Sequence, residues 1–425
     1  MSQSIFRSGV ARNSLALIGL LVCGWGMWTS GRAGASREES EHARKARSVE
    51  AAQEAVRLSP GDPIAFAVRA EAWAKRNTIS ESVKDFKTAV TLRPEDYLLW
   101  LRLGYARERL EDREGALAAY QQAVRLAPYY GQPRWYAGNM LLDLGRKDEA
   151  FVELSRAAAS NPDLSGLVFD LAWTAYNGDG AAVERAIRPQ TAPARLALAR
   201  FFVAQGRAGE AMQLFRTAGP VAPEEQRALV EAFLAGKLFP EAYAVWAEGR
   251  ISPANASNGG VARIFDGGFE QEIILNDPGF GWDVNNSSQQ VHFAMDWSEP
   301  HSGAQSLRLD WAGNSDPQVM VIKQLVLVEP HTRYRLHFAA RTRELLSVSL
   351  PIVSVSDAND DKQSALAQSP ALPRATTPWQ DYSLEFTTAE KTSAVLIGVR
   401  REACNTYPCS ILGNLWLDDF VLQRL

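Results

Sequence analysis

The sequence is short of the residues that build metal-rich and disulfide-rich proteins. It has three cysteines and five histidines among 425 residues, too few for a disulfide-knotted scaffold or a series of zinc modules. Neither sign of charge dominates, because 45 basic residues stand against 49 acidic ones. No whole-chain positive field is therefore available to attract nucleic acid. The H-E-x-x-H, G-x-S-x-G and P-loop patterns of common catalytic sites are also missing.

The charge is unevenly distributed along the chain. Residues 1–250 carry 32 basic and 29 acidic residues, whereas residues 251–425 carry 13 basic and 20 acidic ones. Two of the three cysteines, Cys404 and Cys409, also lie in the acidic part. This contrast between the two parts indicates separate units joined end to end.

An apolar run near the N-terminus has the features of an export signal. Arg7 and Arg12 precede residues 15–28 (LALIGLLVCGWGMW), and the small residues 33–35 (AGA) follow. A basic start, a short apolar core and an A-x-A site are typical of a secretory signal peptide. Fourteen helical residues span about 21 Å, less than the ~30 Å hydrocarbon core, which favours cleavage. An uncleaved inner-membrane anchor over residues 14–30 and a buried helix of the folded domain are the alternatives.

A repeat of constant length fills the middle of the chain. Prolines recur at equal intervals, at Pro60, Pro94, Pro128 and Pro162, and an alanine stands five positions before each of them. Self-similarity at a period of about 34 residues indicates stacked helix pairs, with a proline ending the second helix of each pair. One pair cannot bury its apolar face, so at least three must stack. After a signal or anchor in residues 1–35, the sequence therefore predicts an α-solenoid over residues 36–250.

The fullest copy of the repeat, residues 95–128, resembles the tetratricopeptide repeat. Arg107 stands where that family usually has an aromatic residue. The resemblance covers about residues 40–250, with a leading helix, three good repeats, a degenerate repeat near 165–188 and two more repeats to about Gly249. The residues at the spacing typical of the family are Trp100, Leu103, Gly104, Ala116, Tyr120, Ala123 and Pro128.

The resemblance implies a concave face, lined by the first helix of each pair, that binds peptides or partner proteins. The alternative for any single residue on this face is that it binds no partner. The polar residues then form only a solvated helix surface, and Trp135 has only a packing role. Carried over by position in the repeat, the residues that face the groove are Glu71, Lys75, Tyr105, Glu108, Arg109, Trp135, Asn139 and Asp143.

After residue 250 the helical periodicity stops. Residues 251–260 (ISPANASNGG) form a turn-rich linker, and short stretches of alternating apolar and polar residues follow it. Alternation bounded by Gly, Pro, Asn and Asp predicts an antiparallel β-sandwich of about eight to ten strands over residues 261–425. The alternating stretches are residues 306–311, 334–339, 350–355, 382–386, 395–399 and 415–422.

Six sequence blocks in this region resemble carbohydrate-binding modules of the galactose-binding-like jelly-roll type. The first block is residues 266–270 (DGGFE) and the last is residues 417–422 (LDDFVL). The resemblance implies a structural calcium held by Glu270 and by Asp418 or Asp419, because calcium prefers hard carboxylate oxygens. Capping of turns by these carboxylates is the alternative.

Sugar binding in such modules uses aromatic faces and planar polar side chains. We expect Trp282, Trp311 and Trp379 to pack in the core of the sandwich. The candidates for carbohydrate binding are Trp297, Trp416, Arg400 and Arg401.

Cys404 and Cys409 are separated by residues 405–408 (NTYP). In an exported protein, such a pair is expected to form a disulfide. No histidine lies near the two cysteines in the sequence, which disfavours a metal site. The pair also supports an oxidising compartment, independently of the N-terminal segment.

Together these features predict a non-catalytic scaffold of the bacterial periplasm or cell envelope. Its helical groove binds a protein partner and its sandwich binds carbohydrate, with no cofactor besides calcium and no nucleic acid. This two-part design resembles accessory proteins of exopolysaccharide, O-antigen or other surface-polysaccharide assembly. A pure protein–protein adaptor with a structural β domain is one alternative. A glycan-processing enzyme, whose paired carboxylates would come from distant strands, is the other.

Overall fold

The computed structural model describes residues 9–46, 48–250, 262–275, 277–285, 291–404 and 408–425. The chain forms two compact units, Met1–Pro189 and Gln190–Leu425. In the described residues the first unit is helical, whereas the second combines helices with two β-sheets. The predicted linker, residues 251–260, lies outside the described residues.

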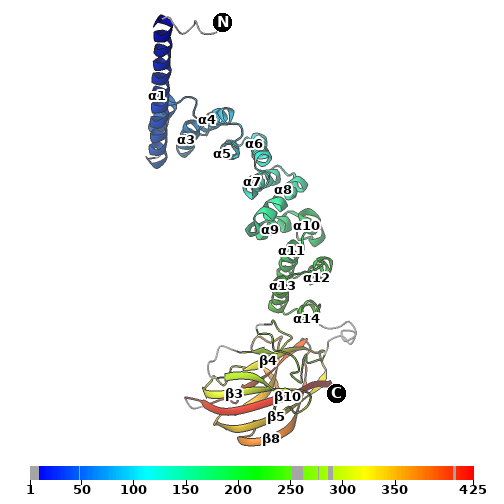
Figure 1. Ribbon diagram of the computed structural model, residues 1–425. Coiled ribbons are helices and arrows are strands. Elements are labelled where there is room, and N and C mark those ends of the chain that lie inside the picture. The colour runs from blue at the N-terminus through cyan, green and yellow to red at the C-terminus, as the bar shows by residue number, and fades with distance from the viewer. Residues whose placement is uncertain (1–8, 47, 251–261, 276, 286–290, 405–407) are drawn as a thin grey trace, which may run out of the picture. The chain divides into compact units, whose positions relative to one another are not determined.

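The first unit is built mainly from antiparallel helix pairs (Figure 1). The first helices of three successive pairs begin at positions 63, 97 and 131, and the second helices begin at positions 79, 113 and 147. Both sets keep the spacing of the repeated prolines, so the predicted period is confirmed. The described helices of this unit are α1 (Gly9–Ala46), α2 (Val49–Leu58), α3 (Pro63–Lys75), α4 (Ile79–Leu92), α5 (Tyr97–Arg109), α6 (Arg113–Leu126), α7 (Gly131–Asp143), α8 (Lys147–Ser160), the 3-10 helix η1 (Pro162–Leu164), α9 (Ser165–Ala175) and α10 (Gly180–Ile187).

Local sequence signals set the ends of these helices. The side chains of Asp62 and Asp96 accept hydrogen bonds from the backbone N–H groups of Ile64 and Leu98, which caps the N-termini of α3 and α5. Helix α4 ends at Leu92, two residues before Pro94, because the residue that precedes a proline disfavours helical geometry. The repeated prolines thus separate one helix pair from the next.

Glycine at two repeat-equivalent positions lets the paired helices approach closely. A Cβ atom at Gly104 would lie 2.4 Å from Cε1 of Tyr120, and one at Gly138 would lie 2.6 Å from Cγ of Leu154. Both distances are far below van der Waals contact, so these positions require glycine while Tyr120 and Leu154 fill the space between the helices.

The second unit begins with two further helix pairs, in agreement with the predicted final repeats. These are α11 (Ala192–Ala204) with α12 (Ala208–Thr217), and α13 (Pro223–Ala235) with α14 (Phe239–Ala247). The preceding pair, α9 and α10, has only 11 and 8 residues in its helices. Its shortness matches the predicted degenerate repeat.

Two antiparallel five-stranded sheets follow, in the orders β1-β4-β9-β6-β7 and β2-β3-β10-β5-β8. The predicted fold class, an α-solenoid followed by an antiparallel β-sandwich, is therefore confirmed. Side chains such as Leu309 and Leu415 from one sheet and Val353 and Ile397 from the other form the core. The strands are β1 (Asp283–Val284), β2 (Val291–Asp296), β3 (Ser306–Asn314), β4 (Ile322–Leu327), β5 (Arg333–Ser347), β6 (Pro351–Asp357), β7 (Ala365–Gln368), β8 (Ala375–Thr387), β9 (Ala394–Arg401) and β10 (Ser410–Arg424).

Helix α14 packs against the sandwich within the second unit. The indole Nε1 of Trp246 donates a hydrogen bond of 2.7 Å to Oδ2 of Asp277, and the Trp246 ring meets Phe265 edge-on at 5.1 Å. The ring of Tyr243 meets Phe280 in the same manner. These aromatic contacts join α14 to the segment that precedes β1, and so attach the last helix pair to the sandwich.

Candidate functional site

A groove of about 700 Å³ opens on α3, α5 and α7, the first helices of three successive pairs, with α4 contributing to its lining. Exposed apolar groups line it, because Tyr105 is 55% exposed and Leu98 is 42% exposed. Both side chains lie on the same concave face, and apolar groups gathered in this way mark a surface that can receive a partner. The other lining residues are Glu71, Ala74, Lys75, Ile79, Ser82, Phe86, Leu101, Arg102, Ala106, Arg109, Gln132 and Tyr136.

The groove carries a net positive charge. Glu71 is paired with Arg102 at 2.6 Å, which leaves Lys75 and Arg109 as the excess cations among the lining residues. Nη1 of Arg109 donates to the carbonyl oxygen of Ala74 at 3.1 Å, so the guanidinium is held at the end of α3. Within the described part of the chain, Lys75 forms no ion pair and is exposed.

The structure brings together four of the eight predicted groove residues, namely Glu71, Lys75, Tyr105 and Arg109. Asn139 and Asp143 occupy the positions of the next repeat that are equivalent to Tyr105 and Arg109, outside this concavity. Nδ2 of Asn139 donates to the carbonyl oxygen of Trp135 at 2.8 Å, and Trp135 is half-buried. Asp143 is exposed.

Glu108, the remaining predicted groove residue, has a structural partner. Its carboxylate accepts a hydrogen bond of 2.6 Å from the hydroxyl group of Tyr120. Burial raises the pKa of Tyr120, and the hydrogen bond to Glu108 raises it further. This hydrogen bond between a neutral phenol and a carboxylate therefore links α6 to α5.

The outer face of the second sheet carries a cluster of arginines around one tryptophan, which we call the arginine–tryptophan patch. It comprises Trp416 on β10, Arg308 on β3, and Arg341 and Arg343 on β5. In the strand register Trp416 lies between Arg308 and Arg341. The guanidinium groups of Arg341 and Arg343 lie 4.8 and 5.0 Å from the centre of the Trp416 ring, a cation–π geometry.

Carboxylates hold this patch together. Nε1 of Trp416 donates to Asp296 at 2.8 Å, and Glu299 pairs with both Arg341 and Arg343. Burial alone would raise the pKa of Asp296, but hydrogen bonds from Ser298 and Trp416 outweigh it and lower the pKa to about 2. Burial lowers the pKa of Arg341, and repulsion by Arg343 adds to this effect.

The four carbohydrate candidates differ in accessibility. Trp297 is 71% exposed, whereas Trp416 is 2% exposed. The alternation of the strand correctly places Trp416 on the outer face of β10. Arginine side chains cover its ring, however, so a sugar cannot stack on it directly. Arg400 is half-buried and Arg401 is 2% exposed. Of these four, Trp297 is the side chain that is fully open to a ligand.

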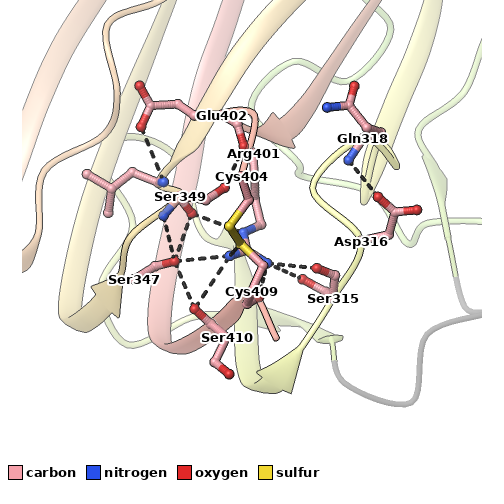
Figure 2. Close-up of a disulfide and its surroundings, with 11 residues drawn as sticks. Ser315, Asp316, Gln318, Ser347, Ser349, Arg401, Glu402, Cys404, Cys409 and Ser410 are labelled. Atoms are coloured by element: carbon pink, nitrogen blue, oxygen red, sulfur yellow. Dashed lines mark hydrogen bonds between the residues drawn. A yellow bond between two sulfur atoms is a disulfide. The ribbon is translucent and has the colours of Figure 1, made fainter. Parts of the chain in front are cut away.

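Arg401 is a buried structural cation. Its Nε donates to the carbonyl oxygen of Ser349 at 3.0 Å, and its Nη1 donates to those of Ser315 and Cys409 at 2.8 and 2.9 Å. Figure 2 shows these bonds around the disulfide between Cys404 and Cys409. The disulfide confirms the predicted pairing. Arg401 is unavailable to a surface sugar because its guanidinium is used inside the fold.

The three predicted calcium ligands surround one loop. Oδ2 of Asp418 accepts hydrogen bonds from the backbone N–H groups of His301 and Ser302 at 3.0 and 3.2 Å. Oε1 of Glu270 accepts one from Ala304 at 2.9 Å, and Asp419 accepts one from the Ser302 hydroxyl at 2.6 Å. Burial raises the pKa of Asp418. The carboxylates thus fix residues 301–304.

In the described part of the chain, no group of three or more His, Cys, Asp and Glu side chains has a geometry that would hold a metal ion. The lone pairs of Glu270 and Asp418 already accept backbone hydrogen bonds. As placed, these carboxylates bind the backbone of residues 301–304 and are not grouped as a metal shell. Calcium binding stays a prediction, for which calorimetric titration is the direct test.

A family model of the tetratricopeptide repeat matches residues 75–131 and 101–165, the segment in which the helix pairs keep their constant period. These residues are similar to tetratricopeptide repeats. The peroxisomal targeting signal receptor of Candida albicans is 33% identical over 70 residues, which make up 16% of this chain and 12% of the receptor. The match therefore spans about an eighth of the receptor's length.

Solved structures show weaker likenesses to this chain. A MamA structure from Desulfovibrio magneticus covers 44% of this chain and 93% of its own, with 15% identity and a TM-score of 0.30. The CBM22-1 xylan-binding domain of Paenibacillus barcinonensis Xyn10C covers 39% of this chain and 96% of its own, with 14% identity and a TM-score of 0.27. Likenesses of this size carry no functional conclusion for this chain.

The sequence missed part of the environment of both candidate sites. Trp379 was expected in the core, but it is half-buried, and its ring lies 5.3 Å from that of His301. In the helix pairs of the first unit, Leu98 and Gln132 also line the groove. Leu98 and Gln132 occupy equivalent positions in successive repeats. The repeat period could therefore have identified both as groove residues.

Proposed function

We propose that this protein is a non-catalytic adaptor that binds an extended, acidic segment of a partner protein in its helical groove. The observation that carries the proposal is the exposure of Tyr105 and Leu98 beside the excess cations Lys75 and Arg109. Apolar side chains supply contact area, and the cations select acidic partners and increase the association rate. The tetratricopeptide repeats support a scaffold of this kind.

Reversing both excess charges, in the double variant Lys75→Glu/Arg109→Glu, is expected to weaken peptide binding about tenfold, because each exposed charge contributes up to ~1 kcal/mol. The ligand is first selected from a displayed peptide library with the full chain as bait. Its affinity is then measured by fluorescence anisotropy. Lys87→Glu is the matched control, since Lys87 is an exposed cation on α4 that does not line the groove. Equal affinity for the two variants would rule out the groove as the binding site.

We further propose that the outer face of the second sheet binds a polysaccharide. Planar guanidinium groups and an exposed indole are the side chains that recognise sugar hydroxyl and carboxylate groups, and both types occur here. Trp297 belongs to the segment 296–299, which contacts the arginine–tryptophan patch through Asp296 and Glu299. The disulfide and the apolar helix α1 support the further proposal that the protein is exported to the bacterial envelope. There its binding face would serve surface-polysaccharide assembly.

Binding of the full chain to an array of bacterial polysaccharides tests this second proposal. The variants Trp297→Ala and Arg343→Gln are each expected to lower the signal roughly tenfold, which corresponds to about 1.4 kcal/mol. Arg424→Gln serves as the control, because Arg424 is a similarly exposed arginine that pairs with Glu329. If no polysaccharide binds, the sandwich has a purely structural role. Release of shortened glycan would instead indicate the enzymatic alternative.

A further inference from the structure

We propose that helix α1 is retained in the mature protein as a single-span membrane anchor and that it runs without a break into the first helix pair of the first unit. The partner of its uncovered surface is a lipid bilayer. This inference concerns how the protein is held in place, and it is independent of the ligands of the groove and the sandwich.

The N-terminal half of α1 is apolar and uncovered. From residue 15 to residue 28 its large side chains are exposed, including Leu20 at 72%, Trp25 at 68% and Met27 at 72%. Helix α1 is long and apolar enough to cross a membrane, and the most apolar stretch is not buried against the rest of the chain. An apolar surface of this extent requires an apolar surrounding, which a bilayer supplies.

The uncharged part of α1 is longer than its apolar core. Arg12 and Arg32 delimit residues 13–31, which contain no charged side chain. Nineteen helical residues span about 28 Å, close to the ~30 Å hydrocarbon core. Residues 15–28 alone are shorter than the hydrocarbon core, but the uncharged residues Thr29, Ser30 and Gly31 can also lie within the membrane boundary.

The C-terminal half of the same helix is part of the folded unit. Ser36, Ser40 and Ala43 are buried, at the spacing of three to four residues that marks one face of a helix. Oγ of Ser36 donates to the carbonyl oxygen of Ala55 on α2 at 2.8 Å. The A-x-A sequence at residues 33–35 therefore lies inside a continuous helix that is packed against α2 immediately beyond the cleavage point.

Arg32 connects the two halves. Its Nε donates to the carbonyl oxygen of Leu58 at 3.0 Å, and its Nη2 donates to that of Arg57 at 2.9 Å. These are terminal carbonyls of α2, and a cation at the C-terminus of a helix is favourable. The guanidinium also lies 4.6 Å from the centre of the Trp28 ring. Cleavage after Ala35 would remove Arg32 and leave the C-terminus of α2 without this cap.

The first experiment determines the intact mass of the full chain expressed in a bacterial host, after the membranes have been washed with alkaline carbonate. We expect the protein in the membrane pellet with residues 1–35 still attached. A mass that begins at Ser36, a lipid-modified N-terminus at Cys23, or recovery in the wash would each overturn the anchor.

A second experiment uses purified full chain mixed with vesicles of phosphatidylethanolamine and phosphatidylglycerol. The variant Leu17→Arg/Leu21→Arg is expected to lose flotation with the vesicles, because both side chains lie on the exposed half of α1. The variant Arg37→Glu/Glu38→Arg, just beyond that half, should float as the wild type does. Unchanged helical circular dichroism shows that each variant is folded, and flotation of both variants would contradict the proposal.

The role of Arg32 has its own readout. Arg32→Gln is expected to lower the melting temperature of the full chain in detergent, while Arg37→Gln, an exposed arginine further along α1, leaves it unchanged. If both variants melt at the wild-type temperature, the Arg32 cap does not stabilise the first unit. Loss of Arg32 by cleavage would then not lower the stability of that unit.

Discussion

Replacing Arg401 by methionine is expected to destabilise the second unit by about 3 kcal/mol. The guanidinium is the donor for the buried carbonyl oxygens of Ser349, Ser315 and Cys409. Methionine fills much of the volume but donates nothing, and each buried acceptor left unpaired costs about 1–3 kcal/mol. Removing a buried cation offsets part of this loss, since burial already lowers the pKa of Arg401. Thermal unfolding should show a decrease of roughly 6–12 °C.

Arg400→Met is the matched control for this variant. Arg400 is the adjacent residue on β9, is half-buried, and has an Nε atom that is buried without a hydrogen-bond partner. Its replacement should therefore change stability by less than about 1 kcal/mol. Arg401→Lys keeps the charge but not the forked geometry, so we expect an intermediate loss. Equal melting of the Arg401 and Arg400 variants would contradict a structural role for Arg401.

The helical part of the fold could be predicted because its information is repeated. Pro60, Pro94 and Pro128 each mark the boundary between two helix pairs. Because the same spacing recurs in every repeat, a misplaced helix boundary in one repeat would disagree with all the others. Strand β4 shows the opposite case. Its residues are buried on both faces, so its sequence does not alternate, and alternation could not reveal it.

The candidate sites were less predictable. The alternation of a strand shows on which side of the sheet a side chain lies, but not which side chains from other strands pack over it. Trp416 does point away from the core, yet Arg341 and Arg343, which come from another strand, lie over its ring. Arg400 and Arg401 are adjacent and chemically identical, so the sequence does not distinguish them. Only in the folded protein does Arg401 donate hydrogen bonds to buried carbonyl oxygens. Contacts between distant segments decided each of these outcomes.

Truncating Trp246 to alanine is expected to have the largest effect on the second unit, about 3–5 kcal/mol. Trp246 is 2% exposed, and its ring packs against Phe265 at 5.1 Å and Phe280 at 5.7 Å. The substitution leaves a cavity where α14 meets the β-sheets. It also removes the Nε1 donor to Asp277, whose carboxylate then depends on Arg250, 2.6 Å away. Because these contacts attach α14 to the sandwich, we expect calorimetry to show one transition for the second unit of the wild type and two for the variant.

Two further variants separate packing from hydrogen bonding at this junction. Trp246→Phe keeps an aromatic ring in the core and loses mainly the bond to Asp277, so a cost of about 1–2 kcal/mol is expected. Trp297→Ala removes an indole that is 71% exposed and should leave the unfolding transition unchanged. If Trp246→Ala still unfolds in a single transition at the wild-type temperature, α14 and the sandwich do not stabilise each other. A single transition at a lower temperature would mean that the attachment of α14 survives, because the remaining pairing of Tyr243 with Phe280 holds the two parts together.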